Sequence, residues 1–459
     1  MTRLLTGRVD RHRMRFFTYL EIGVMLATIL QWLVIATLTG VVVGTGTSLF
    51  LHALFYLTAR AEAAPFWLVL AMLPAGGLLN GLLLHYGYRL NSSGLKDSLF
   101  AGVHVQHGRM PFRTIWIKPV AALITLASGG SAGKEGPCSH IGASLAAAIG
   151  RVLHLNAELR QRLVACGVSA GFASVFGTPI GGAIYGVEVL AIGRIRSDFL
   201  FPAVVAGVAS LQTSLWWGLP YDSYRLSGLP QFSQLVFFKT IAIGLICGIA
   251  ALVFIEMVKA MTRLFTAIRM KWKLWPPLMP LAGGCILALL VLLIPTDYLG
   301  LSLPLMDRAL AGQPMPYLGF LWKTLLVAIT LGSGYYGGIV TPQFVIGAVS
   351  GNAVAHLFGL DPALGAAVGL VSVLASASNT PIAAILMGME LFGATIGTGY
   401  IAGAAIAAYV IIGHRSVYPE QRVAYSKSSW LRIRPDLTVG NEKAQLSYGL
   451  LRWWQRHRR

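Results

Sequence analysis

Long apolar stretches interrupted by glycine and proline dominate the chain. Six of them approach the about 20 residues that a helix needs to cross a bilayer: 20–43, 65–86, 199–217, 235–258, 277–295 and 395–413. Shorter apolar pieces between them contain glycine and proline, which favour broken or re-entrant helices. The pattern therefore predicts an all-α polytopic membrane protein made of many tilted and broken helices.

Two pairs of segments repeat along the chain. Residues 128–143 (SGGSAGKEGPCSHIGA) align with 333–348 (SGYYGGIVTPQFVIGA) at an offset of 205, and 167–188 align with 369–390 at an offset of 202. Such repeats with glycine- and proline-broken segments are typical of transporters and channels whose ion site lies between two halves. We expect an odd number of crossings in each half, which would invert one half relative to the other. The two related halves are about 20–215 and 235–415.

Basic residues gather at both termini and at the ends of apolar runs. The chain holds 36 Lys and Arg against 17 Asp and Glu, a net charge of +19, with 56% hydrophobic residues and a mean hydropathy of +0.68. The positive-inside rule explains this excess better than binding to nucleic acid does. We expect a cytoplasmic basic N-terminus (1–19), a transmembrane domain (20–418) and a short basic cytoplasmic tail (419–459). The expected location is a bacterial inner membrane, with lipid and no nucleic acid as partner.

The four cysteines stand singly in apolar surroundings, at Cys138, Cys166, Cys247 and Cys285. This pattern is typical of small buried residues rather than of metal ligands or disulfides. We expect no disulfide, no metal site and no cofactor.

A glycine-rich turn followed by proline opens a helical run in each repeat. The turns read SAGKEGP and YYGGIVTP. Proline favours the first turn of a helix, so both are predicted to end at helix N-termini, where free N–H groups and the helix dipole bind anions. Glu135 would then be a tethered carboxylate that blocks the anion site until it rotates away or is protonated. Lys134 would help to keep Glu135 ionised; the alternative is simple pairing of these two residues at the membrane edge.

At these residues the chain resembles the CLC family of chloride channels and chloride/proton antiporters, over nearly the whole transmembrane domain. Residues 133–137 (GKEGP) match the family's G(K/R)EGP motif, and 338–342 (GIVTP) match GxFxP with valine for phenylalanine. HRSVYPEQ (414–421) resembles the segment whose tyrosine contacts the central anion, and SSGLK (92–96) is a weaker match to GSGIP. The resemblance implies Glu135 as the gating glutamate and the anion-binding residues Ser93, Gly133, Lys134, Gly136, Ile339, Val340 and Tyr418.

The resemblance also implies the CLC fold with two inverted halves, chloride as the transported ion, and a homodimer with one pore in each subunit. Residues 199–217 and 401–413 are candidate interface segments. We expect no paired cytoplasmic CBS modules. The GxFxP-type motif argues against the fluoride-specific branch of the family.

The position of the family's internal proton-relay glutamate holds Val189 in this chain. Valine carries no proton, so the sequence favours an uncoupled chloride channel that responds to voltage and pH. A chloride/proton antiporter with another proton route is the alternative. Glu188 and its repeat mate Glu390 are intramembrane carboxylates with an expected structural role in hydrogen bonding. His140, one turn after Glu135, is expected to be packed rather than to carry protons.

Two other classes of protein remain. Residues 129–133 (GGSAG) fit the G-x-S-x-G pattern of hydrolases, but that pattern needs a preceding strand, and the repeat replaces Ser131 by Tyr336. The protein is therefore not expected to be an enzyme. A membrane scaffold without transport is the last alternative.

Overall fold

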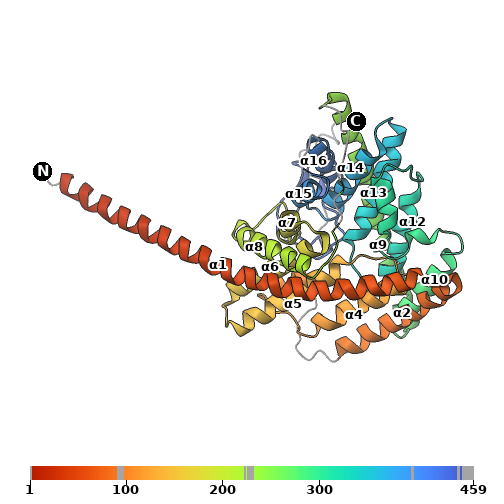
Figure 1. Ribbon diagram of the computed structural model, residues 1–459. Helices are drawn as coiled ribbons and strands as arrows, with labels where there is room; N and C mark the ends of the chain where they lie inside the picture. The colour runs from red at the N-terminus through yellow and green to blue at the C-terminus, as the bar shows by residue number, and fades with distance from the viewer. Residues whose placement is uncertain are drawn as a thin grey trace.

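A computed structural model describes residues 3–89, 98–221, 224, 232–393, 397–441 and 445–446, with side chains from residue 20 onward except at 88, 89 and 446 (Figure 1). Within these residues the fold is almost entirely helical. The first half contains α1 (Arg3–Glu62), α2 (Phe66–Arg89), α3 (Leu99–His104), α4 (Thr114–Ala127), α5 (Glu135–Val152), α6 (Ala157–Phe176), α7 (Pro179–Glu188), β1 (Ala191–Ile192) and α8 (Ser197–Trp216).

The second half repeats this order from α9 onward. It contains α9 (Gln234–Trp272), α10 (Leu278–Leu290), η1 (Thr296–Tyr298), α11 (Leu303–Leu310), α12 (Gly319–Ser333), α13 (Val340–Leu357), α14 (Pro362–Ala377), α15 (Pro381–Phe392) and α16 (Gly397–Ile411). The C-terminal segment adds β2 (Arg422–Val423), β3 (Leu431–Arg432) and β4 (Gln445–Leu446). Helices α5 and α13 begin 205 residues apart, the offset of the first sequence repeat.

In the part of the chain that the structure describes, four helices are long and apolar enough to cross a membrane: Leu20–Glu62 of α1, Phe66–Gly87 of α2, α8 and α9. The predicted spans 277–295 and 395–413 are wrong in length. They correspond to the shorter helices α10 and α16, because a turn over residues 291–294 follows α10 and the Gly413 turn follows α16. The predicted mixture of long helices and shorter, broken ones is confirmed.

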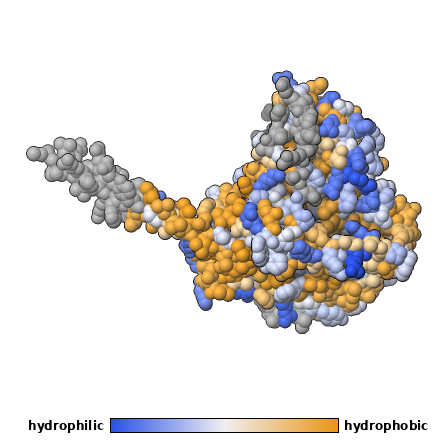
Figure 2. Space-filling model, viewed as in Figure 1, coloured by the Kyte–Doolittle hydropathy of each residue, from blue (hydrophilic) through white to orange (hydrophobic). Residues whose placement is uncertain are grey.

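Helix α1 is far longer than a bilayer is thick. Its 43 residues from Leu20 to Glu62 extend about 65 Å at 1.5 Å per residue, against the ~30 Å of the hydrocarbon core. The helix therefore lies tilted or extends beyond the hydrocarbon core. Figure 1 shows it running along the body and then projecting from it toward the N-terminus, and Figure 2 shows the apolar surface where it meets the body.

The two halves are built around matching helix pairs that pack at backbone contact. Helix α5 packs on α6 and α13 packs on α14. A Cβ atom on Gly142 of α5 would lie 2.0 Å from the carbonyl oxygen of Gly167 on α6. In the second pair, a Cβ on Gly347 would lie 2.4 Å from the carbonyl oxygen of Gly369. Both contacts exist only because these residues lack side chains.

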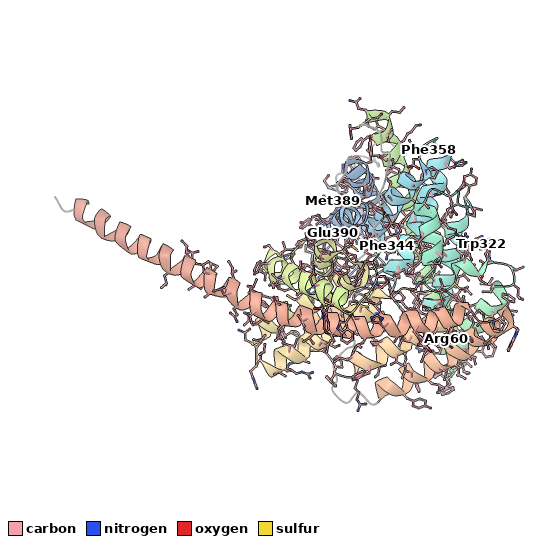
Figure 3. The ribbon with its side chains drawn as sticks, in the orientation of Figure 1. Arg60, Trp322, Phe344, Phe358, Met389 and Glu390 are labelled. Carbon is pink, nitrogen blue, oxygen red and sulfur yellow. The ribbon has the colours of Figure 1, made fainter. Side chains whose placement is uncertain are left out.

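Two carboxylates join the halves reciprocally. Glu188, at the end of α7, accepts hydrogen bonds from the backbone N–H groups of Ile382 (3.2 Å) and Ala383 (2.7 Å) at the start of α15. Glu390 of α15 (Figure 3) accepts from the first N–H groups of α7, at 2.9 and 2.8 Å. Each carboxylate thus lies at a helix N-terminus, where the dipole favours negative charge. The structural role expected for this pair matches the observed bonds.

The segment after α16 folds back on the body. Strand β2 pairs in parallel with β1, which follows α7. The side-chain amide of Gln421 donates to the carbonyl oxygens of Val189 (2.9 Å) and Ser378 (3.0 Å). These bonds fix the residues just before β2, including Tyr418, against α7 and α14.

Candidate functional site

The two glycine-rich turns meet in the middle of the molecule. Gly133 and Gly338 exchange both backbone hydrogen bonds, N–H to carbonyl, at 2.8 Å in each direction. Gly133 comes just before α5 and Gly338 just before α13, so this bridge brings the two helix N-termini together. The predicted convergence of the two repeats at an anion-binding geometry is therefore present in the structure.

The carboxylate of Glu135 lies on the N-terminus of α13. It accepts hydrogen bonds from the N–H of Val340 (2.5 Å), the N–H of Thr341 (3.2 Å) and the hydroxyl of Thr341 (2.7 Å). Its side chain is only 1% exposed. A negatively charged group with three donors at a helix N-terminus is held by charge-assisted hydrogen bonds and by the dipole. A small anion would meet the same donors if Glu135 left.

The turn glycines leave the space that this carboxylate fills. A Cβ on Gly338 would lie 2.0 Å from a carboxylate oxygen of Glu135, and one on Gly133 would lie 2.3 Å from the other oxygen. Both positions therefore need glycine so that the backbone can approach the charge closely. The glycine-rich composition of the turns has this local cause.

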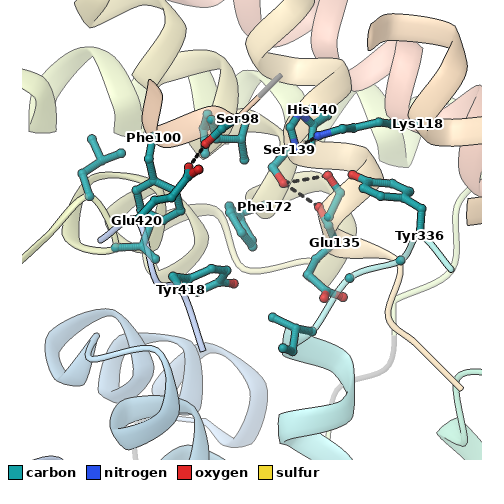
Figure 4. A pocket seen from close by; sticks show the side chains of 18 of the residues that line it. Ser98, Phe100, Lys118, Glu135, Ser139, His140, Phe172, Tyr336, Tyr418 and Glu420 are labelled. Carbon is teal, nitrogen blue, oxygen red and sulfur yellow. Dashed lines mark hydrogen bonds between the residues drawn. The ribbon is translucent and has the colours of Figure 1, made fainter. Parts of the chain in front are cut away.

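A pocket of about 320 Å³ lies next to Glu135 (Figure 4). Its apolar walls come mainly from Phe100, Phe172 and Val189. Tyr418 also lines it, and its hydroxyl lies 3.1 Å from the hydroxyl of the buried Tyr185. The pocket thus combines an apolar wall with a few convergent polar groups, as ion and ligand sites do.

A buried lysine and a histidine form part of the same wall. The ammonium nitrogen of Lys118 on α4 lies 2.9 Å from Nε2 of His140 on α5, and both residues line the pocket. Lys118 also lies over the ring of Tyr336, with its nitrogen 5.2 Å from the centroid. His140 is packed as predicted, but with a partner that sequence reasoning missed.

The repeat mate of Lys118 has a different environment. Lys323 on α12, at the same offset of 205, is fully buried, and its ammonium donates to Ser131, Ser302, Tyr298 and Gly300 at 2.8 to 3.3 Å. Ser131, the serine of the G-x-S-x-G pattern, is thus an acceptor for this lysine. Extending the alignment of the first repeat pair toward the N-terminus would have matched Lys118 with Lys323 from the sequence alone.

The predicted anion-binding residues differ in whether they line the pocket, donate to Glu135 or lie outside the described residues. Tyr418, Gly136 and Ile339 line the pocket. Ile339 is the residue before α13. The backbone donors to Glu135 are Val340, which is among the predicted residues, and Thr341, which is not. Ser93 lies outside the described residues.

The side chain of Lys134 lies against α1. Its ammonium lies over the ring of Phe55 on α1, 5.1 Å from the centroid, and its residue is not among those that line the pocket around Glu135. Its role in anion binding stays a prediction. Lys118, rather than Lys134, is the cation beside the pocket.

Val189 lines the pocket. Among the described residues, no group of three or more His, Cys, Asp or Glu side chains is arranged to hold a metal ion. The residues that line the pocket supply backbone N–H groups, hydroxyls, the carboxylates of Glu135 and Glu420, and the ammonium of Lys118.

Comparison with known proteins identifies the architecture. A family model described as voltage gated chloride channel matches residues 76–413. The chain belongs to this family, the CLC family. A chloride/fluoride channel protein of Pseudomonas syringae pathovar tomato is 35% identical to it over 410 residues, which cover 88% of this chain and 89% of that protein. The CLC fold and anion transport as the general activity follow from this membership.

Solved structures of the CLC family agree with the fold. The structure of a CLC-type fluoride/proton antiporter is 32% identical, with a TM-score of 0.79, and covers 86% of this chain and 98% of that one. A slow cyanobacterial Cl⁻/H⁺ antiporter matches with a TM-score of 0.70 at 21% identity, which bears on the fold alone. Fluoride occurs in the names of both relatives above 30% identity.

Proposed function

We propose that this CLC protein exchanges a small halide for protons across the membrane, with Glu135 as the gate in each subunit. The observation that carries the proposal is the position of the Glu135 carboxylate on three donors at the N-terminus of α13. A carboxylate and a halide compete for the same donors, so only one of them can occupy the site at a time.

Protonation supplies the link between the two ions. A protonated Glu135 loses the negative charge that the α13 dipole and the three donors favour, so it leaves the site more easily and an anion enters. When the anion departs, the ionised carboxylate returns. Halide and proton would then pass the same point alternately, and one site would serve both.

Chloride and fluoride are the substrates we propose. The hydroxyl of Thr341 and two N–H groups form a compact set of hydrogen-bond donors, without a full positive charge at contact. Such a set suits a small anion that must be released again. The names of the 35% and 32% identical relatives refer to fluoride, which adds this ion to the chloride expected from the sequence.

An uncoupled channel is the second candidate. Val189 at the relay position favours it, since this side chain cannot pass a proton to Glu135. The 35% identical relative is also named a channel protein. The two candidates differ in whether protons move with the halide.

Liposomes that contain the purified protein separate these candidates. Efflux of chloride or fluoride and the external pH are recorded together for wild type and Glu135→Gln. Exchange predicts that an outward halide gradient drives protons inward against their own gradient, and that Glu135→Gln retains halide efflux without proton movement. Halide efflux without protons in wild type would contradict exchange and support the channel. Absence of any halide flux would contradict both.

A homodimer is part of the proposal. The candidate interface segments carry apolar side chains that are exposed in one chain, including Phe201, Val208, Ile406 and Val410. Such side chains can face lipid or a second copy. The mass of the purified protein in detergent, measured by light scattering with the detergent subtracted, should equal two chains; a mass of one chain would contradict the dimer.

A further inference from the structure

The pocket beside Glu135 has a second carboxylate at its far end. Glu420, two residues after Tyr418, lines the pocket and is exposed to solvent. Its carboxylate accepts a hydrogen bond from the hydroxyl of Ser98 at the start of α3. Figure 4 shows Glu420 and Glu135 on opposite sides, with Phe172 and Tyr418 between them.

A negative charge is an unexpected choice for the mouth of an anion path. It lowers the local concentration of halide and raises that of protons. The contact with Ser98 does not by itself need a charge, because the neutral amide of glutamine accepts the same hydrogen bond. The carboxylate therefore points to the handling of protons rather than to anion entry or packing alone.

The space between the two carboxylates can carry protons through water. Phe100, Phe172 and Val189 line it and hold no proton-carrying group. The pocket of about 320 Å³ has room for several water molecules, each of which takes about 30 Å³ in the liquid. The other titratable groups on its wall are Tyr418, Tyr336 and the Lys118–His140 pair, whose nitrogens lie 2.9 Å apart.

We propose that Glu420 is the proton-transfer residue that connects Glu135 with the solvent on the face formed by the C-terminal segment. This inference rests on the halide/proton exchange proposed above. Glu420 takes a proton from solvent and releases it to water in the pocket, which returns Glu420 to a carboxylate. The Glu135 carboxylate accepts a proton from that water and becomes a carboxylic acid. One proton has then crossed the pocket, and Val189 takes no part.

Three variants separate the proton role from the contact with Ser98. Glu420→Gln keeps an acceptor for the Ser98 hydroxyl but cannot titrate, and Glu420→Asp restores a titrating group. Ser98→Ala removes the contact and keeps the carboxylate. Glu62→Gln, at the exposed end of α1, is the control for loss of one acidic charge elsewhere. Each protein is measured in liposomes loaded with chloride and, separately, with fluoride.

The readout is the number of protons moved per halide. We expect Glu420→Gln to lower it by roughly tenfold, below the ~10²–10⁴-fold that a positioned proton-transfer group contributes, because water alone still carries some protons. Halide efflux should continue, which shows that the variant is folded. Glu420→Asp should recover a large part of the ratio, while Ser98→Ala and Glu62→Gln should retain it.

Three results would overturn the inference, and they differ in meaning. An unchanged ratio in Glu420→Gln, with wild type moving protons, would remove Glu420 from the path and leave the exchange intact. An equal loss in Ser98→Ala and Glu420→Gln would assign the effect to the contact instead of the proton. If wild type moves no protons at all, the exchange itself fails and the role of Glu420 falls with it.

Discussion

Replacing Thr341 by valine tests how tightly the gate is held. Valine has the shape of threonine without the hydroxyl, and the site is 1% exposed. The variant removes one of the three donors to Glu135, the hydroxyl at 2.7 Å, and keeps both backbone N–H groups. A hydrogen bond to a charged group contributes about 1.5–3 kcal/mol. The equilibrium between Glu135 in the site and Glu135 out of it should therefore shift about 10- to 150-fold toward the open state.

The transported anion also loses the Thr341 hydroxyl, so a double-mutant cycle is needed. Halide efflux is measured at alkaline pH for wild type, Thr341→Val, Glu135→Ala and the double variant. Alanine at position 135 cannot accept from Thr341, so the change from threonine to valine in the Glu135→Ala background reports the effect on the anion alone. With Glu135 present, Thr341→Val should raise halide efflux at least about tenfold more than it does when Glu135 is replaced. Equal ratios in the two backgrounds would refute the hydrogen bond as a gate contact.

Three further predictions concern the gate, the fold and pH. Gly338→Ala should flatten the pH dependence of halide efflux, since its Cβ would lie 2.0 Å from a Glu135 oxygen and displace the carboxylate; an unaltered pH profile would argue against this contact. Glu188→Ala should lower the free energy of unfolding by about 3 kcal/mol, because two charge-assisted hydrogen bonds are lost. Glu390→Ala should lower it by less, because the Glu390 carboxylate is more exposed. Thermal unfolding in detergent measures both, and a larger loss of stability in Glu390→Ala than in Glu188→Ala would contradict this. Burial lowers the pKa of Lys427 to about 6, so between pH 6 and 10.5 the unfolded chain binds a proton that the folded chain does not. The free energy of unfolding should then rise with pH across this window by at most about 1.4 kcal/mol per pH unit and level off below pH 6. Chemical denaturation at several pH values should show that Lys427→Met loses this part of the pH dependence. The same pH dependence in Lys427→Met and wild type would contradict the assignment.

The central architecture was predictable because its signals are local. Glycine turns followed by proline mark the starts of α5 and α13, and two segment matches at nearly one offset reveal the halves. The position of Glu135 follows from one motif. The sequence shows Glu188 and Glu390 as a repeated pair, but it does not show that each carboxylate binds the N-terminus of the helix that carries the other.

The remaining parts of the site depend on contacts between distant segments. Thr341 looks like an ordinary residue of the second turn, and only the bridge between Gly133 and Gly338 brings its hydroxyl to Glu135. Glu420 stood in a segment assigned to the tail, and the β1–β2 pairing folds that segment over the pocket. Lys134 was assigned to the site by its neighbour, yet the start of α5 turns it toward α1.

Binding of halide to the detergent-solubilised protein tests the central claim most directly, namely that Glu135 occupies the anion site. Titration calorimetry with fluoride and, separately, chloride compares wild type with Glu135→Ala, which leaves no side chain able to reach the donors on α13. The account predicts that at least one halide binds Glu135→Ala about tenfold or more tightly, because the tethered competitor with its charge-assisted bonds is gone. Equal affinities of wild type and Glu135→Ala for both halides would contradict it.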